Sequence, residues 1–85
     1  MLHTPQIIEV EPREDFTLLL TFTNGEQRVF DMRPELETVV FSPLRDLSLF
    51  KQVKVVFGCL EWPGERDLAY DMLYVQSEPV PMGAG

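Results

Sequence analysis

Large apolar residues occupy every second position from residue 16 to residue 22, and the dipeptide Asn24-Gly25 follows almost at once. A period of two is typical of a β-strand with one buried face. Asn-Gly is a strong signal for a tight hairpin, because both residues accept positive φ values. The sequence therefore predicts a β-hairpin near the N-terminus, whose apolar face the rest of the fold has to cover.

Two registers of this hairpin compete. A two-residue turn pairs Leu20 with Val29, whereas a three-residue loop with a left-handed Gly25 pairs Leu18 with Phe30. A shift of one residue moves every side chain to the opposite face of a strand. We predict the three-residue loop because it gathers the apolar residues on one face, namely Phe16, Leu18, Leu20, Phe30 and Met32.

A second hairpin is predicted from residues 53–57 and 60–62. Gly58 and Cys59 fit a type II′ turn, which takes glycine at its first position. This register opposes Phe57 to Leu60. It gives an apolar face that contains Val53, Val55, Phe57, Leu60 and Trp62, and an opposite face that contains Lys54, Val56 and Glu61.

Three other segments show weaker patterns. Residues 6–11 lie between two prolines, which is typical of a strand at the edge of a sheet. Ser42 and Pro43 indicate a helix start, with Ser42 as the N-cap and Pro43 at the first helical position. Residues 67–75 fit either a strand or a short helix capped by Asp67. We expect the helix.

These elements predict an α+β fold with an antiparallel sheet of about five strands, built from two hairpins with one short helix between them and a short C-terminal helix. The 85 residues suffice for one small domain, which we place at residues 1–76. Residues 77–85, with two prolines and two glycines, predict a disordered tail. An uncovered edge at residues 6–11 or 53–57 favours a homodimer.

The net charge is −7, from 14 acidic and 7 basic residues. This balance argues against a protein that binds nucleic acid through its phosphates. Residues 38–57 have a local charge of +2, and both flanks are acidic. An acidic surface suits a basic protein partner, although acids also simply keep a small domain soluble.

The sequence also bears on the compartment. Cys59 is the single cysteine, which excludes an intramolecular disulfide. No apolar run approaches the roughly 20 residues that span a bilayer, and the N-terminus lacks the pattern of a signal peptide. We expect a cytoplasmic protein that binds neither a membrane nor nucleic acid directly.

Three motifs resemble a known bacterial family. They are F-x-N-G-x-x-R-x-F-D at residues 22–31, S-P-L-x-D at residues 42–46 with Phe50 beyond it, and E-W-P-G-x-x-D-L-x-x-D-x-L-Y at residues 61–74. Together they resemble domain-of-unknown-function family 2442 over roughly residues 7–77.

This resemblance implies an α+β fold with an antiparallel sheet and no established activity, catalytic residue or cofactor. Members of the family often occur beside another small protein, in what look like toxin–antitoxin pairs. In longer members a helix-turn-helix segment follows the domain. This chain lacks such a segment, so the resemblance does not imply direct DNA recognition.

The segment from residue 61 to residue 74 supplies the candidate site. Four carboxylates cluster there with three aromatic residues, and Trp and Tyr are enriched in protein interfaces. We expect Trp62 mainly in the core and both tyrosines nearer the surface. The candidate partner-binding residues are Glu61, Trp62, Glu65, Asp67, Tyr70, Asp71 and Tyr74.

The leading hypothesis is a non-enzymatic protein-interaction module, an antitoxin-like partner of a small basic protein encoded by a neighbouring gene. It assigns no catalytic residue, metal ligand or cofactor. One alternative is a small enzyme or metal-binding protein that uses the carboxylates of Glu61, Glu65, Asp67 and Asp71. Another is a regulatory domain that senses a small ligand.

Overall fold

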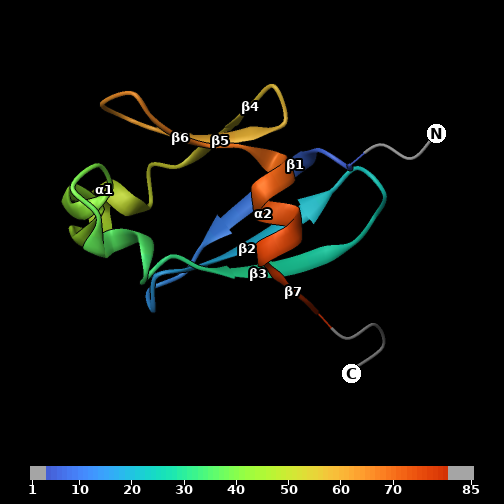
Figure 1. Ribbon diagram of the computed structural model, residues 1–85, viewed down its shortest axis with the longest axis horizontal. Coiled ribbons are helices and arrows are strands. Elements are labelled where there is room, and N and C mark those ends of the chain that lie inside the picture. Colours follow the sequence, from blue (N-terminus) through green and yellow to red (C-terminus); the bar gives the residue numbers. More distant parts are fainter. Residues whose placement is uncertain (1–3, 81–85) are drawn as a thin grey trace.

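A computed structural model describes residues 4–80 of the chain. Its strands form two antiparallel sheets, where the sequence predicted a single sheet (Figure 1). The first sheet has the strand order β1-β2-β3-β7, and the second has the order β4-β5-β6. Short helices complete this α+β fold. The strands are Ile7–Pro12 (β1), Thr17–Phe22 (β2), Gln27–Asp31 (β3), Lys54–Val56 (β4), Cys59–Trp62 (β5), Arg66–Leu68 (β6) and Glu78–Pro79 (β7), the 3-10 helices are Glu35–Glu37 (η1) and Ser42–Arg45 (η2), and the α-helices are Leu47–Phe50 (α1) and Tyr70–Gln76 (α2).

Strands β2 and β3 pair in the predicted register, with Leu18 opposite Phe30. Gly25 has a φ of +87° in the loop between them, and the Phe22 amide donates to the Glu26 carbonyl oxygen over 2.9 Å. Turn chemistry and apolar pattern point to the same register here, and such agreement is typical of well-specified elements. The prediction of a three-residue loop is confirmed.

Strand β1 contains a bulge at Ile8. Ile7 pairs with Phe22 and Val10 with Leu20, so β1 has one residue more than the facing part of β2. A bulge breaks the alternation of faces along a strand. Ile7 and Val10 therefore both pack on the core, and Ile8 is 54% exposed. A strict alternation along this segment predicts Ile8 and Val10 on one face and Ile7 on the other, and that prediction is wrong because of the bulge.

The register predicted for the second hairpin was wrong by one residue. Val55 pairs with Leu60 and Val56 with Cys59, so the turn consists of Phe57 and Gly58. Both turn residues have positive φ, +50° and +80°, as a type I′ turn requires. Phe57 therefore leaves the apolar face and is 95% exposed.

The helix predicted to start at Ser42 is split into η2 and α1. Ser42 does not cap it, because its hydroxyl donates to the Val39 carbonyl oxygen. Instead the Asp46 carboxylate caps α1 and accepts from the Ser48 amide at 3.0 Å and from the Ser48 hydroxyl at 2.8 Å. These hydrogen bonds hold the pKa of Asp46 below its usual value.

The C-terminal segment contains a strand and then a helix. We predicted Asp67 as the cap of the helix, and this prediction is wrong. Asp67 lies in β6 opposite Glu61, and α2 begins at Tyr70 after Ala69. Glu78 of β7 then pairs with Val29 of β3. The ordered part thus extends past residue 76, where we placed the end of the domain, and residues 81–85 of the predicted tail lie outside the described residues.

The core lies where α2, the two sheets and the segment from η1 to α1 meet. Helix α2 crosses one face of the four-stranded sheet, and α1 lies at the left of the molecule (Figure 1). Trp62 is 1% exposed, its ring stacks on Phe50 at 6.3 Å, and its Nε1 donates to the Phe50 carbonyl oxygen over 2.8 Å. The prediction that Trp62 lies mainly in the core is confirmed.

Candidate interaction surface at the β5–β6 turn

A hollow of about 320 Å³ lies at the turn between β5 and β6. Four of the seven candidate site residues line it, and they all belong to this one hairpin. The lining residues are Glu61, Trp62, Pro63, Gly64, Glu65 and Asp67. Because Trp62 is almost fully buried, the side chains that a ligand or partner meets at this hollow are mainly acidic.

The turn beside the hollow is fixed by its backbone angles and by Arg66. Gly64 and Glu65 both have positive φ, +88° and +61°. The Arg66 guanidinium folds back over the turn and donates to the Pro63 carbonyl oxygen from Nη1 and to the Val40 carbonyl oxygen from Nε, each over 2.7 Å. A Cβ atom on Gly64 would lie 2.1 Å from Nη1, so the arginine needs glycine at this position. The turn is thus tied to the segment that precedes η2.

The charge at this turn is not balanced. Glu61 and Asp67 are cross-strand partners, and like charges in this arrangement destabilise a sheet. Lys54 of β4 is the cation nearest to Glu61, at 4.0 Å, with both side chains well exposed. An exposed pair of this length contributes little. The hairpin therefore concentrates negative charge at a cost that the described residues offset only in part.

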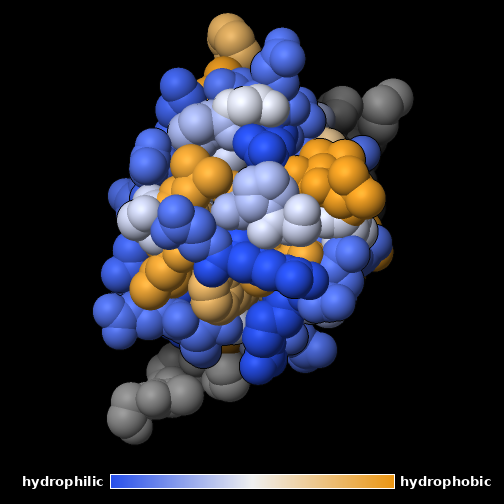
Figure 2. All heavy atoms as spheres, turned by 90° about the vertical axis from the view of Figure 1, so that its left-hand side faces the viewer, coloured by the Kyte–Doolittle hydropathy of each residue, from blue (hydrophilic) through white to orange (hydrophobic). Residues whose placement is uncertain are grey.

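Within residues 4–80, every arginine and lysine side chain already has an acceptor group close by. Six of the seven lie within 4.0 Å of a carboxylate, and Arg66 is bound to the two carbonyl oxygens described above. The local +2 charge of residues 38–57 is neutralised, since Arg45 pairs with Glu37, Lys51 with Glu14 and Lys54 with Glu61. On the face that carries α1, hydrophilic side chains separate the apolar groups into small clusters (Figure 2).

The other three candidate residues lie on α2. Tyr70 packs against the core. Asp71 is exposed in the first turn of the helix, and its carboxylate accepts from the Met72 amide over 2.9 Å. None of these three residues lines the hollow at the β5–β6 turn. The candidate residues therefore form two separate groups.

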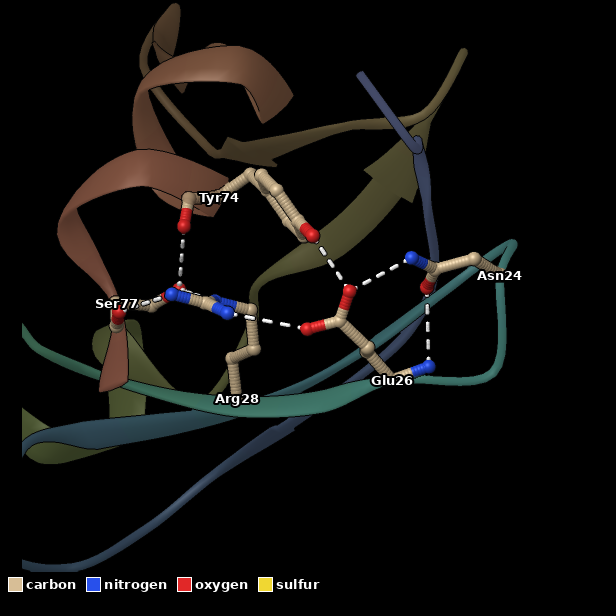
Figure 3. A network of polar contacts seen from close by, with 5 residues as sticks. All are labelled: Asn24, Glu26, Arg28, Tyr74 and Ser77. Atoms are coloured by element: carbon tan, nitrogen blue, oxygen red, sulfur yellow. Dashed lines mark hydrogen bonds and ion pairs between the residues drawn. The ribbon is translucent and has the colours of Figure 1, made fainter. Parts of the chain in front are cut away.

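Tyr74 belongs to a polar network that sequence reasoning missed (Figure 3). Its hydroxyl donates to Oε1 of Glu26, which also accepts from Nδ2 of Asn24 at 2.7 Å. Arg28 donates to the other Glu26 oxygen at 3.1 Å, and its guanidinium carbon lies 4.7 Å from the centre of the Tyr74 ring. On the far side Arg28 donates to the hydroxyl and the carbonyl oxygen of Ser77, at 2.8 and 2.6 Å.

This network fastens the end of α2 to the first hairpin. The hydrogen bond from the Tyr74 hydroxyl is the main cause that lowers the pKa of Glu26, and the same bond raises the pKa of Tyr74. A carboxylate held ionised beside a phenol held neutral is poorly suited to accept or release protons near neutral pH. The network therefore joins α2 to the first hairpin through an ionised carboxylate and a neutral phenol.

One sequence signal does point to the network. Asn24, Arg28 and Tyr74 are all letters of the motifs at residues 22–31 and 61–74. Arg28 is a charged, partly buried residue on the same face of the hairpin as the core residues Leu20 and Phe30, and such a residue needs a partner. That partner lies 49 positions further along the chain. Local patterns carry no information about a contact at that separation.

The described residues also bear on metal binding and on membrane insertion. Within residues 4–80, no three His, Cys, Asp or Glu side chains lie close enough together to hold a metal ion. The helices in this range are all too short or too polar to cross a bilayer.

The family comparison agrees with the resemblance seen in the motifs. No curated protein and no solved structure matches the chain. A family model described as "Protein of unknown function (DUF2442)" matches residues 7–79, which include both sheets and α2. The chain therefore belongs to the DUF2442 family.

Proposed function

We propose that this chain is a non-enzymatic interaction module of the bacterial cytoplasm, an antitoxin-like partner of a small basic protein. The observation that carries the proposal is the excess of carboxylates over the cations available to pair with them. Within residues 4–80, ion pairs use six carboxylates and leave eight of the fourteen without a cation. Carboxylates that no arginine or lysine of the same chain neutralises attract a positively charged partner. This attraction also raises the rate at which the two proteins associate.

The hollow at the β5–β6 turn is the best place for the first contact. Glu61, Glu65 and Asp67 surround it, and the turn that carries them is held by Arg66. A rigid group of acids loses less conformational entropy on binding than a flexible one. A lysine or arginine side chain of the partner would relieve the repulsion between Glu61 and Asp67, which face each other across the hairpin.

The test is co-expression with the product of the neighbouring gene, followed by size-exclusion chromatography and measurement of the dissociation constant. We expect one shared peak, and an affinity that falls as salt is added, because salt screens the attraction. Two separate peaks at micromolar concentration would contradict the proposal.

Charge variants locate the contact. The triple substitution Glu61→Gln, Glu65→Gln and Asp67→Asn should weaken binding about tenfold or more, because each substitution removes one charge contact and the three losses of binding free energy add up. The matched control, Glu11→Gln, Glu35→Gln and Glu78→Gln, likewise removes one carboxylate of an exposed ion pair and two unpaired ones, and leaves the same net charge. Equal loss in both variants would show that total charge, not this hollow, sets the affinity.

Calorimetric titration of the isolated chain separates the proposal from the metal-binding alternative. Magnesium, calcium and manganese should give no heat of binding and no shift in melting temperature, because a ligand specific to the folded state must stabilise it. Saturable heat that the Glu61, Glu65 and Asp67 triple variant abolishes would favour a metal site instead.

A further inference from the structure

Phe57 combines two unfavourable features that nothing else in the described chain offsets. Its φ is +50°, and its side chain is 95% exposed. Phenylalanine at positive φ is a steric outlier, and the first position of a type I′ turn is ordinarily filled by asparagine, aspartate or glycine. A fully exposed aromatic ring adds the cost of hydrating an apolar surface.

Phe16 provides the comparison within the same chain. It also has positive φ, at +64°, but its ring packs against the core with its centre 5.2 Å from that of Phe50. Packing therefore compensates the backbone strain at Phe16. At Phe57 no residue in the range 4–80 supplies such packing, since the side chain is 95% exposed, and unrelieved strain of this kind is typical of functional positions.

The turn that presents Phe57 is held in place. The Ile7 amide donates to the Gly58 carbonyl oxygen over 3.0 Å, which ties the turn to the first strand of the other sheet. Gln6 lies over Gly58 so closely that a Cβ atom there would be 2.8 Å from the Gln6 Cβ. Phe57 is thus displayed by a braced hairpin, and an anchor that is already in position binds with less loss of entropy.

The surface next to Phe57 continues from apolar to acidic. Val56 and Cys59 pair beside the turn, and both side chains are half-buried on the outer face of the three-stranded sheet. Two residues further along β5, Glu61 pairs with Asp67 on that same face. We call this strip the outer face of β4–β6, and define it as Lys54, Val56, Phe57, Cys59, Glu61 and Asp67. Lys54 is the cross-strand partner of Glu61 on β4, and its Nζ lies 4.0 Å from the Glu61 carboxylate.

We propose that the outer face of β4–β6 is the docking surface for the basic partner, and that Phe57 is its apolar anchor. The partner would present an apolar pocket for the phenyl ring, bordered by lysine or arginine that meets Glu61 and Asp67. Buried aromatic anchors surrounded by polar contacts dominate the binding energy of many interfaces. This inference rests on the proposed function and adds the surface and the chemistry of the partner.

Charge decides between a basic partner and a second copy of this chain. On this strip the two carboxylates of Glu61 and Asp67 outnumber the single cation, Lys54, so two docked copies would bring four carboxylates against two lysines, with a net charge of −7 on each chain. Like charges at an interface are strongly unfavourable. A positively charged partner turns the same groups into attractive contacts.

The test uses Phe57→Asn, which suits the turn and removes the ring, and Val75→Gln as the control. Val75 is 77% exposed on α2, outside this strip. We expect Phe57→Asn to raise the melting temperature, because asparagine tolerates positive φ, and to weaken binding to the purified product of the neighbouring gene about tenfold or more. Val75→Gln should leave that affinity unchanged.

A photo-cross-linking experiment gives an independent readout of the same contact. p-Benzoylphenylalanine placed at residue 57 should form a covalent adduct with the purified partner, whereas the same group at residue 75 should not. If the wild-type chain binds the partner and Phe57→Asn binds it equally tightly, the inference is overturned but the proposed function is not. No binding by the wild-type chain would overturn both.

Analytical ultracentrifugation of the chain alone tests whether it forms a homodimer through this surface. We expect a single species whose size does not change with protein concentration. A dimer in the wild-type protein that Phe57→Asn abolishes would overturn the basic-partner assignment and make a second copy the occupant of this surface.

Discussion

Trp62 joins the three-stranded sheet to the helical segment by two kinds of contact. Its ring lies between Phe41 and Phe50, with centres 6.0 and 6.3 Å away, and its indole nitrogen satisfies the Phe50 carbonyl oxygen. A carbonyl at the end of the one-turn helix α1 has few other partners. A single side chain thus provides both packing and a buried hydrogen bond.

Replacing Trp62 by phenylalanine should lower the free energy of unfolding by about 2–4 kcal/mol, because it leaves a cavity and an unpartnered carbonyl. Urea denaturation of both proteins measures the difference. Phe41→Leu removes ring contact but no hydrogen bond, and should cost less. Equal losses for the two variants would mean that the hydrogen bond contributes nothing.

Tyr74→Phe tests the polar network through its pH dependence. The pKa of Glu26 is lowered in the folded state, so the stability that this group contributes is present above the pKa it has when unfolded and is lost as the pH falls through the folded value. The pKa of Tyr74 is raised, so its contribution is present below the unfolded value and is lost as the pH rises through the folded one.

The melting temperature of Tyr74→Phe should therefore fall below that of the wild type at about pH 7, and the gap should narrow in acid, at a pH below the folded pKa of Glu26, where this carboxylate is protonated in both proteins. Thermal unfolding followed by circular dichroism at both values measures the gap. A gap that stays constant with pH would show that the hydroxyl does not interact with the Glu26 carboxylate.

At the residue scale, the sequence predicted burial better than it predicted partners. Trp62 could be assigned to the core because a thin core needs its area. Asp67 was expected to cap a helix because Asp is common at that position, but the helix begins three residues later. Glu26 and Ser77 drew no attention because each is ordinary in its local context, and Arg28 entered only as a letter of the motif at residues 22–31.

Two turns offer a matched comparison at the scale of elements. Gly25 and Gly64 have nearly the same φ, +87° and +88°. An added Cβ meets nothing within 4 Å at Gly25 but would overlap the Arg66 guanidinium at Gly64. Backbone strain is therefore equal at the two positions, and only Gly64 adds a contact.

Gly25→Ala should destabilise the protein by about 1–2 kcal/mol, the cost of a left-handed alanine. Gly64→Ala should cost roughly 1 kcal/mol more, because Arg66 must release a carbonyl oxygen. Chemical denaturation of both variants gives the two values. Should Gly64→Ala prove the milder change, the arginine brace would not stabilise the turn.

The two hairpins show why register can be predicted in one case and missed in the other. In the first, Asn24-Gly25 and the apolar pattern agree on one answer. In the second, the apolar character of Phe57 placed it in the strand, whereas the backbone uses it in the turn with Gly58. Hydrophobic patterning assumes that apolar residues are buried, and it fails where one is displayed.

The division into two sheets belongs to the scale of the whole molecule. Sequence patterns identify strands, but the neighbours of a strand depend on the paths of the connections between them. The residues between β3 and β4 form a helical segment long enough to redirect the chain, and the first sheet gains its fourth strand from β7. The pairing of β3 with β7 spans most of the sequence and has no local signal.

The unpaired carboxylates make stability depend on salt. Repulsion between like charges, such as that of Glu61 and Asp67 across the hairpin, is screened within about 10 Å at 0.1 M salt. The exposed ion pairs are screened too, but each contributes little. Raising sodium chloride from about 20 mM to about 500 mM should therefore raise the melting temperature.

Differential scanning calorimetry at both salt concentrations measures this shift. The triple variant Glu61→Gln, Glu65→Gln and Asp67→Asn should respond less than the wild type, because it lacks part of the repulsion. A melting temperature that falls with added salt would show that attraction within the ion pairs outweighs repulsion among the free acids.

The fastening of Arg28 to Ser77 also sets the order in which a growing chain can fold. During synthesis the first hairpin leaves the ribosome long before α2 and β7 are made, and a lone hairpin is marginal in water. Arg28 therefore has no Ser77 to bind until the ribosome has added another 49 residues. The fold should therefore close only after α2 and β7 have left the ribosome, so shorter nascent chains lack the contacts that protect them from proteases.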